Sequence, residues 1–132
     1  MTFTEAEIEY LESQPLGRLT TLGPRGEPQA RPVGVHLGPD GTIDVVGYSN
    51  ATSQKWRNVE RDPRVTFLVD DIASLRPWKV RGIEIRGEAK ALFGVGSTVP
   101  GMSGDVIRIH PRRVLSWGIN GDQPRVVARD VG

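Results

Sequence analysis

The part of the sequence best suited to chemistry is residues 49–58, where a lysine stands at the predicted start of a short helix. With Thr52 or Ser53 as the N-cap, Lys55 falls in the first helical turn. The helix dipole and the unpaired backbone N–H groups already make that end positive, so a lysine there is unfavourable by roughly 0.3 kcal/mol. A bound anion would reverse this balance, because helix N-termini bind phosphates. The segment is therefore a candidate site for a phosphate-bearing ligand.

Neighbouring polar side chains favour this anion site over the alternative interpretation, a solvated helix face. Hydroxyl groups precede the helix, and a second cation follows Lys55 within it. Gln29 and Arg31 share one face of a preceding strand, and a charge in the middle of a strand needs a partner or a ligand. The candidate anion-binding residues are Gln29, Arg31, Ser49, Asn50, Thr52, Ser53, Lys55, Arg57 and Asn58.

A predicted antiparallel sheet must position these residues. Strands are expected over residues 17–22, 29–37, 43–48, 64–69, 80–91, 105–109 and 112–117. Gly-Pro-x-Gly repeats between the first three strands are typical of hairpin turns, so these strands are predicted to form a meander. Six or seven antiparallel strands with only short helices are better closed into a barrel than left with open edges. We predict one mainly β domain over residues 1–132.

Two short helices and several loops complete the prediction. Thr4 and Glu7 form a capping box before a helix over residues 5–13. The second helix, which carries Lys55, should end at Asp62-Pro63. Residues 92–104 and the stretch around Trp78 are expected to be loops, and the tail 120–132 is polar apart from two valines.

Composition excludes several classes of function. Hydrophobic residues make up 37% and charged residues 25% of the 132 positions, which is ordinary for a globular domain. The net charge of +1 gives no general attraction to nucleic acid or membrane, and the absence of cysteine excludes disulfides and thiol chemistry. Neither a signal peptide nor an apolar run of about 20 residues is evident. We therefore expect a soluble cytoplasmic protein with no nucleic-acid or membrane partner.

No motif for catalysis by the protein's own side chains stands out. His36 and His110 are far apart and lack the companions of a metal site, so no metal is expected. Neither a phosphate loop nor a nucleophile elbow is present, and Asp70-Asp71 is interpreted as a surface pair at a strand end. We predict no catalytic residue, which is typical of a chain that holds a cofactor.

Five segments in this order resemble the pyridoxamine 5′-phosphate oxidase-like split-barrel flavoprotein family. They are residues 17–22 (GRLTTL), 29–34 (QARPVG), 55–59 (KWRNV), 61–65 (RDPRV) and 108–114 (RIHPRRV). The chain is most similar to small actinobacterial members that use the deazaflavin coenzyme F-420, in the subgroup that includes a tetracycline-biosynthesis reductase. The end of the chain lacks the C-terminal motif of true pyridoxamine phosphate oxidases, so vitamin B6 oxidation is not expected.

The resemblance implies an FMN-binding-like split β-barrel that forms a homodimer with two cofactor sites at the interface. It implies that the cofactor phosphate is held by Ser49, Thr52, Ser53, Lys55 and Arg57. It also implies that the second strand lies along the ring system, with Gln29, Arg31, Pro32 and Val33. Trp78 and Lys79 would approach the ring or the substrate from the next loop, in one subunit or the other.

The predicted function is hydride transfer from reduced F-420 to an electron-poor double bond of a small organic substrate. One alternative keeps the fold and binds FMN as an oxidoreductase. Another is a non-catalytic protein that binds and sequesters a cofactor.

Overall fold

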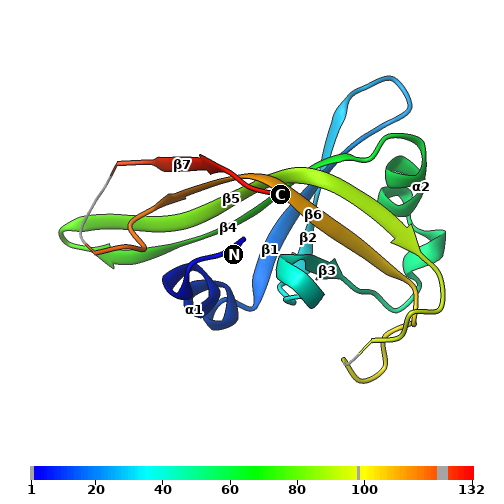
Figure 1. Cartoon of the computed structure of the whole chain (residues 1–132), viewed down its shortest axis with the longest axis horizontal. Coiled ribbons are helices and arrows are strands. Elements are labelled where there is room, and N and C mark those ends of the chain that lie inside the picture. Colours follow the sequence, from blue (N-terminus) through cyan, green and yellow to red (C-terminus); the bar gives the residue numbers. More distant parts are fainter. Residues whose placement is uncertain (1, 98, 122–124) are drawn as a thin grey trace.

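Seven strands form one antiparallel sheet in the described part of the chain, and two short helices pack against it (Figure 1). The computed structural model describes residues 2–97, 99–121 and 125–132, so residue 98 of the predicted loop and residues 122–124 of the predicted tail lie outside the described ranges. The elements are α1 (Glu5–Ser13), β1 (Leu16–Leu22), β2 (Pro28–Gly34), β3 (Ile43–Val45), α2 (Gln54–Arg61), β4 (Arg64–Leu75), β5 (Trp78–Leu92), β6 (Val106–Trp117) and β7 (Val127–Asp130). The strand order is β2-β1-β4-β5-β6-β3, with β7 beside β6. The predicted mainly β antiparallel fold with short flanking helices is confirmed.

The core lies between one face of the sheet and the two helices. Alternate residues of β4 and β5 point to this face, because successive side chains of a strand lie on opposite sides. Fully burying each of the larger ones contributes roughly 2 kcal/mol. Six apolar residues that alternate along these two strands are all buried: Val65, Phe67, Val69, Ile83, Ile85 and Ala89.

The predicted meander of the first three strands is wrong beyond its first hairpin. β1 and β2 pair over seven residues, but β3 pairs with β6 at the opposite end of the strand order. Only an isolated bridge joins Leu37 to Ile43 across the second predicted turn. Pro28 and Pro32 of β2 have no N–H to donate, which suits β2 to the edge position it occupies.

The stretch around Trp78 is part of a hairpin and not a loop, which corrects the prediction. β4 and β5 stay paired beyond the end of β6, with Ile72 opposite Val80 and Leu75 opposite Trp78. These four apolar side chains share the face that points away from the core, and all four are exposed, Trp78 by 64%. We call this extension the apolar arm; it projects away from the end of the sheet where α2 lies (Figure 1).

The C-terminal part of the sheet also differs from the prediction. The two strands expected over residues 105–109 and 112–117 form one strand, β6. The register shifts where Gly87 pairs with Pro111 and Arg86 with Arg113, which leaves Arg112 as the extra residue of a bulge. A bulge accommodates Pro111, which lies between the two predicted strands. In the tail predicted to be polar, residues 127–130 form β7 against β6.

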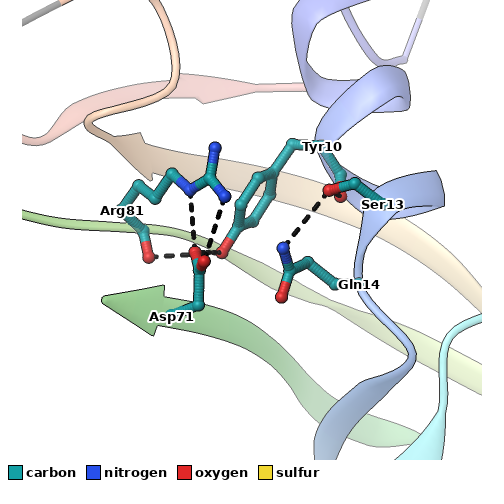
Figure 2. A network of polar contacts seen from close by, with 5 residues as sticks. All are labelled: Tyr10, Ser13, Gln14, Asp71 and Arg81. Atoms are coloured by element: carbon teal, nitrogen blue, oxygen red, sulfur yellow. Dashed lines mark hydrogen bonds and ion pairs between the residues drawn. The ribbon is translucent and has the colours of Figure 1, made fainter. Parts of the chain in front are cut away.

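Helix α1 is held on the sheet by a polar cluster at the base of the apolar arm (Figure 2). The Tyr10 hydroxyl donates to Oδ1 of Asp71 at 2.7 Å, and Arg81 binds the same carboxylate at 2.9 and 3.0 Å. The hydrogen bond from Arg81 lowers the pKa of Asp71, and burial raises the pKa of Tyr10. The interpretation of Asp71 as a strand-end surface residue is wrong, because β4 continues to Leu75.

No helix within the described ranges is long and apolar enough to cross a membrane.

Candidate functional site

The site begins at the N-terminus of α2, which forms as predicted. Ser53 is the N-cap, and its side-chain oxygen accepts a hydrogen bond from the backbone N–H of Trp56 at 3.3 Å. Lys55 is therefore the second residue of the helix, and no acidic residue lies in the first turn. Buried Trp56 and Val59 fix the helix on the core, so the polar face with Lys55 has a defined position.

A pocket of ≈ 260 Å³ lies where this helix start meets β1 and β2. It brings together predicted residues that are far apart in sequence, from the second strand and from the helix. Five of its seven lining residues were predicted: Gln29, Arg31, Pro32, Ser53 and Lys55. The other two, Thr21 and Gln54, were missed. Thr21 lies directly opposite Gln29 in the β1–β2 ladder, so the hairpin register would have identified it.

Lys55 and Arg31 bring two positive charges to this pocket. Burial lowers the pKa of the half-buried Lys55 ammonium, and the charge of Arg31 lowers that pKa further. Arg31 donates one hydrogen bond, from Nη1 to the carbonyl oxygen of Ala30 at 2.9 Å. Among the residues that the structure describes, neither cation forms an ion pair. Two like charges at a partly buried pocket are unfavourable, so the arrangement is suited to an anion.

Arg57 supports the loop before the helix. Its Nη1 donates to the carbonyl oxygen of Thr52 at 2.9 Å, and its Nη2 donates to Oε1 of Gln54 at 2.8 Å. The Thr52 hydroxyl in turn donates to the carbonyl oxygen of Ser49 at 3.0 Å. Ser49, Thr52 and Arg57 are exposed and do not line the pocket. Direct binding of a phosphate by these three residues stays a prediction.

Behind the pocket lies Asn58, which was predicted with Lys55 and Arg57 as part of the anion site but does not line the pocket. Its side chain is fully buried, and Nδ2 donates to Oγ1 of Thr21 at 2.9 Å and to Oε1 of Gln29 at 2.8 Å. Its Oδ1 accepts from Nε2 of Gln54 at 2.8 Å and from Nη2 of Arg61 at 3.1 Å. Three of these four partners line the pocket. A polar residue in the middle of a short helix was the only sequence signal for this role.

The remaining predicted residues lie outside the lining of this pocket. Val33 is buried in the core, with 8% of its surface exposed. Trp78 and Lys79 belong to the apolar arm of β4 and β5 and are exposed. A single chain does not place them in the pocket, so their contact with a cofactor or substrate stays a prediction.

A larger hollow of ≈ 640 Å³ lies between the N-terminal segment and β7. Its charged lining residues include Arg129 and Asp130. Both are already paired, Arg129 with the buried carboxylate of Glu7 at 2.5 Å and Asp130 with Arg113 at 2.7 Å. The third charged lining residue, Asp40, is acidic. This hollow therefore lacks the unpaired cations of the pocket at α2, and we regard the latter as the candidate site.

Comparison with known proteins relates this chain to an enzyme family. The profile of the family described as "Pyridoxamine 5'-phosphate oxidase" matches residues 3–118. A 5a,11a-dehydrotetracycline/5a,11a-dehydrooxytetracycline reductase from Streptomyces rimosus is 44% identical over 134 aligned residues, covering 99% of this chain and 94% of the relative.

Two solved structures share the fold. A conserved hypothetical protein from Mycobacterium tuberculosis is 29% identical with a TM-score of 0.70, covering 89% of this chain and 86% of the other. A protein described as an F-420 reductase is 22% identical with a TM-score of 0.61, covering 80% of this chain and 94% of the other. The latter likeness concerns the fold alone.

Proposed function

This chain belongs to the pyridoxamine 5′-phosphate oxidase family, and we propose that within it the protein is a reductase that uses coenzyme F-420. That it is an oxidoreductase follows from its 44% identity to a reductase along nearly the whole chain. The proposed reaction is transfer of a hydride from reduced F-420, and of a proton from water, to an electron-poor carbon–carbon double bond of a small organic molecule. The name of the relative from S. rimosus, a dehydrotetracycline reductase, supports this class of substrate.

The observation that carries the choice of a phosphate-bearing cofactor is the pair of cations at the α2 pocket. Lys55 and Arg31 have no acidic partner among the described residues, and burial together with their mutual repulsion lowers the pKa of Lys55. Phosphate would neutralise both charges and accept hydrogen bonds at the helix N-terminus. The donor set therefore fits the phosphate end of a flavin or deazaflavin.

The chain's own residues would hold and orient this cofactor. Lys55 and Arg31 would bind the phosphate, while Gln29 and Pro32 of β2 border the adjoining surface. The Ser53 hydroxyl also lines the pocket, but its proton is donated to the carbonyl oxygen of Asn50 at 2.7 Å. When bound, the deazaflavin supplies the hydride chemistry. The protein contributes orientation of the reacting partners and exclusion of water, effects that can account for several kcal/mol of the barrier, about 7 or more in favourable cases.

We propose further that the working enzyme is a homodimer. The pocket of ≈ 260 Å³ is below the range of about 300 to 1,000 Å³ that is usual for small-molecule sites, so one chain encloses only part of such a ligand. The apolar arm exposes Ile72, Leu75, Trp78 and Val80 together, as surfaces that bind another protein often do. Contact of the arm with the second subunit's cofactor would give Trp78 and Lys79 the roles predicted for them.

A titration of Lys55→Ala tests the cofactor site. We expect the Kd for F-420 to rise at least about tenfold, because a charge-assisted hydrogen bond to phosphate is lost, while the free energy of unfolding is unchanged or slightly higher. Lys90→Ala, which removes an exposed lysine of β5 outside the pocket, is the matched control and should leave the Kd unchanged. An unchanged Kd in Lys55→Ala would overturn the site.

Titrating FMN alongside F-420 and assaying reduction of enones separate the alternatives. Tighter binding of FMN with a yellow purified protein would favour the FMN oxidoreductase. Tight binding of F-420 without turnover of any acceptor would favour a protein that sequesters the cofactor. Turnover of an enone with reduced F-420 supports the reductase.

A further inference from the structure

We propose that Asn58 is a positioning residue that makes the wall of the α2 pocket donate hydrogen bonds, and so selects a ligand group that only accepts them. The inference rests on the proposed function, because the group concerned is the phosphate of the cofactor. Asn58 itself is fully buried and does not line the pocket, so it acts through the side chains that it contacts.

The orientation of the Asn58 amide is fixed by its neighbours. Arg61 donates to Oδ1 of Asn58 at 3.1 Å, and a guanidinium has no acceptor, so the amide oxygen must face Arg61. Arg61 is held in place by a second hydrogen bond, to the carbonyl oxygen of Leu22 at 2.8 Å. The amide nitrogen of Asn58 therefore faces the opposite side, toward β1 and β2.

A second guanidinium fixes the other end of the network. Arg57 donates to Oε1 of Gln54 at 2.8 Å, so Nε2 of Gln54 must point away from Arg57. That nitrogen donates to Oδ1 of Asn58 at 2.8 Å, which again requires the amide oxygen of Asn58 on this side. Both guanidinium groups thus impose the same direction on the chain of amides.

This direction determines what faces the ligand. Asn58 donates to Oε1 of Gln29 at 2.8 Å, so Nε2 of Gln29 is directed away from Asn58 and is available as a donor. Asn58 also donates to Oγ1 of Thr21 at 2.9 Å, which leaves the hydroxyl proton of Thr21 to be donated elsewhere. Thr21 and Gln29 both line the pocket, as does Lys55.

Glu27 is the acceptor that competes with the ligand. Nε2 of Gln29 lies 3.4 Å from Oε1 of Glu27, at the outer limit of a hydrogen bond, whereas Oε2 of Glu27 accepts from the backbone N–H of Arg25 at 2.9 Å. The amide of Gln29 has two N–H groups, so one remains for a ligand. A phosphate would offer a stronger, charge-assisted partner than this long contact.

The wall formed in this way offers donors only, from Thr21, Gln29 and Lys55. A fully ionised phosphate only accepts hydrogen bonds, so each of these groups has a partner on it. A ligand group that can only donate, such as an amide N–H or an ammonium, would leave these donors without an acceptor. Such a mismatch should lower the affinity for that ligand group by roughly tenfold or more.

The variant Asn58→Asp reverses the polarity without changing the shape of the side chain. The carboxylate keeps its contacts with Arg61 and Gln54, but it accepts on both sides. The hydroxyl of Thr21 and the amide nitrogen of Gln29 then turn toward it and away from the pocket. We expect the Kd for F-420 to rise at least about tenfold, with the urea midpoint of unfolding as a measure of the fold.

Repeating the substitution in a background that lacks the two orienting partners separates the positioning role of Asn58 from simple repulsion by the new charge. In a Thr21→Val, Gln29→Met background, Asn58→Asp should change the Kd less than about threefold, because the two residues through which Asn58 acts are gone. An equal effect in both backgrounds would mean that the charge acts directly on the ligand, and would overturn the proposal. An unchanged Kd in Asn58→Asp alone would do the same.

Gln29→Glu provides the test if Asn58→Asp does not fold. This variant keeps the acceptor for Asn58 but presents a carboxylate oxygen to the pocket, so the Kd for F-420 should again rise at least about tenfold. An unchanged Kd would overturn the role of Asn58. Wild-type protein that binds neither F-420 nor FMN would instead overturn the proposed function, and with it the ligand of this inference.

Discussion

The two helices of this protein begin with the same capping device and carry opposite charges in their first turns. In α1 the side chain of Thr4 caps the backbone N–H of Glu7, and the Glu7 carboxylate accepts from the backbone N–H of Thr4. In α2 the side chain of Ser53 caps Trp56, but the first turn carries Lys55 and no acid. The first arrangement follows the helix dipole and the second opposes it.

The partners of these charges explain the difference. Glu7 is fully buried, and both its oxygens accept hydrogen bonds from Arg129, at 2.5 and 2.8 Å. Lys55 is half-buried beside another cation, Arg31, and no acid among the described residues pairs with either. The charge of α1 therefore contributes to folding, whereas the charge of α2 is available to a ligand.

Removing the partner of the α1 charge should have the largest effect on stability. Arg129→Ala leaves the Glu7 carboxylate buried without a cation, which should lower the free energy of unfolding by about 3 kcal/mol. The measurement is urea denaturation at neutral pH. Binding of F-420 to the folded variant should be unchanged, because Arg129 and Glu7 do not line the α2 pocket.

Arg113→Ala is the matched control for this effect. Arg113 also joins β6 to β7 through an ion pair with Asp130 at 2.7 Å, but the Asp130 side chain is 84% exposed. Breaking an exposed pair should cost less than about 1 kcal/mol. Equal losses in the two variants would contradict the view that the Glu7 pair stabilises α1 through its burial.

Giving α2 the charge of α1 should produce opposite effects on stability and on binding. Lys55→Glu follows the helix dipole and replaces repulsion from Arg31 with attraction, so the free energy of unfolding should rise by about 0.5 kcal/mol. The same change repels phosphate, and the Kd for F-420 should rise by about a hundredfold. Urea denaturation and equilibrium titration measure the two quantities.

Lys90→Glu makes the same change of charge on the exposed surface of β5. It should leave both the free energy of unfolding and the Kd for F-420 nearly unchanged. If Lys55→Glu lowered stability without weakening binding, Lys55 would be a structural residue like those of α1.

Local features of the fold could be predicted from the sequence, whereas long-range pairings could not. The α1 capping box and the start of α2 depend on residues three positions apart, and both were predicted correctly. The partner of Glu7 is 122 residues away in the sequence, in a tail whose strand was not predicted. The pairing of β3 with β6 was missed for the same reason, since a turn motif does not specify a distant neighbour.

The candidate site shows the same division. Gln29 and Arg31 could be selected because alternation along one strand places them on one face. Thr21 required the register of the β1–β2 hairpin, and Asn58 required knowledge of which amide atoms face each other. Sequence reasoning therefore found the charged groups of the pocket, but it did not show that Asn58 is buried behind them and orients the neutral ones.

The smallest expected effect is the pH dependence that distinguishes the charge of α2 from that of α1. Burial, and secondly the charge of Arg31, lowers the pKa of Lys55 in the free protein, and a bound phosphate raises that pKa again. Binding is thus coupled to proton uptake at alkaline pH. The affinity for F-420 should be constant below the lowered pKa of Lys55 and should fall several-fold as the pH rises through it, in titrations between about pH 7 and pH 10.

Stability of the ligand-free protein should change in the opposite direction. In the interval between the lowered pKa of Lys55 and its ordinary value, the unfolded chain binds more protons than the folded one, so the contribution of Lys55 to the free energy of unfolding rises with pH. The difference between wild type and Lys55→Met isolates this contribution from other titrating groups.

Lys55→Arg should bind F-420 without the decline in affinity at alkaline pH, because arginine stays protonated there. A decline that persists in Lys55→Arg would assign the titration to another group and remove the main electrostatic distinction between the two helices.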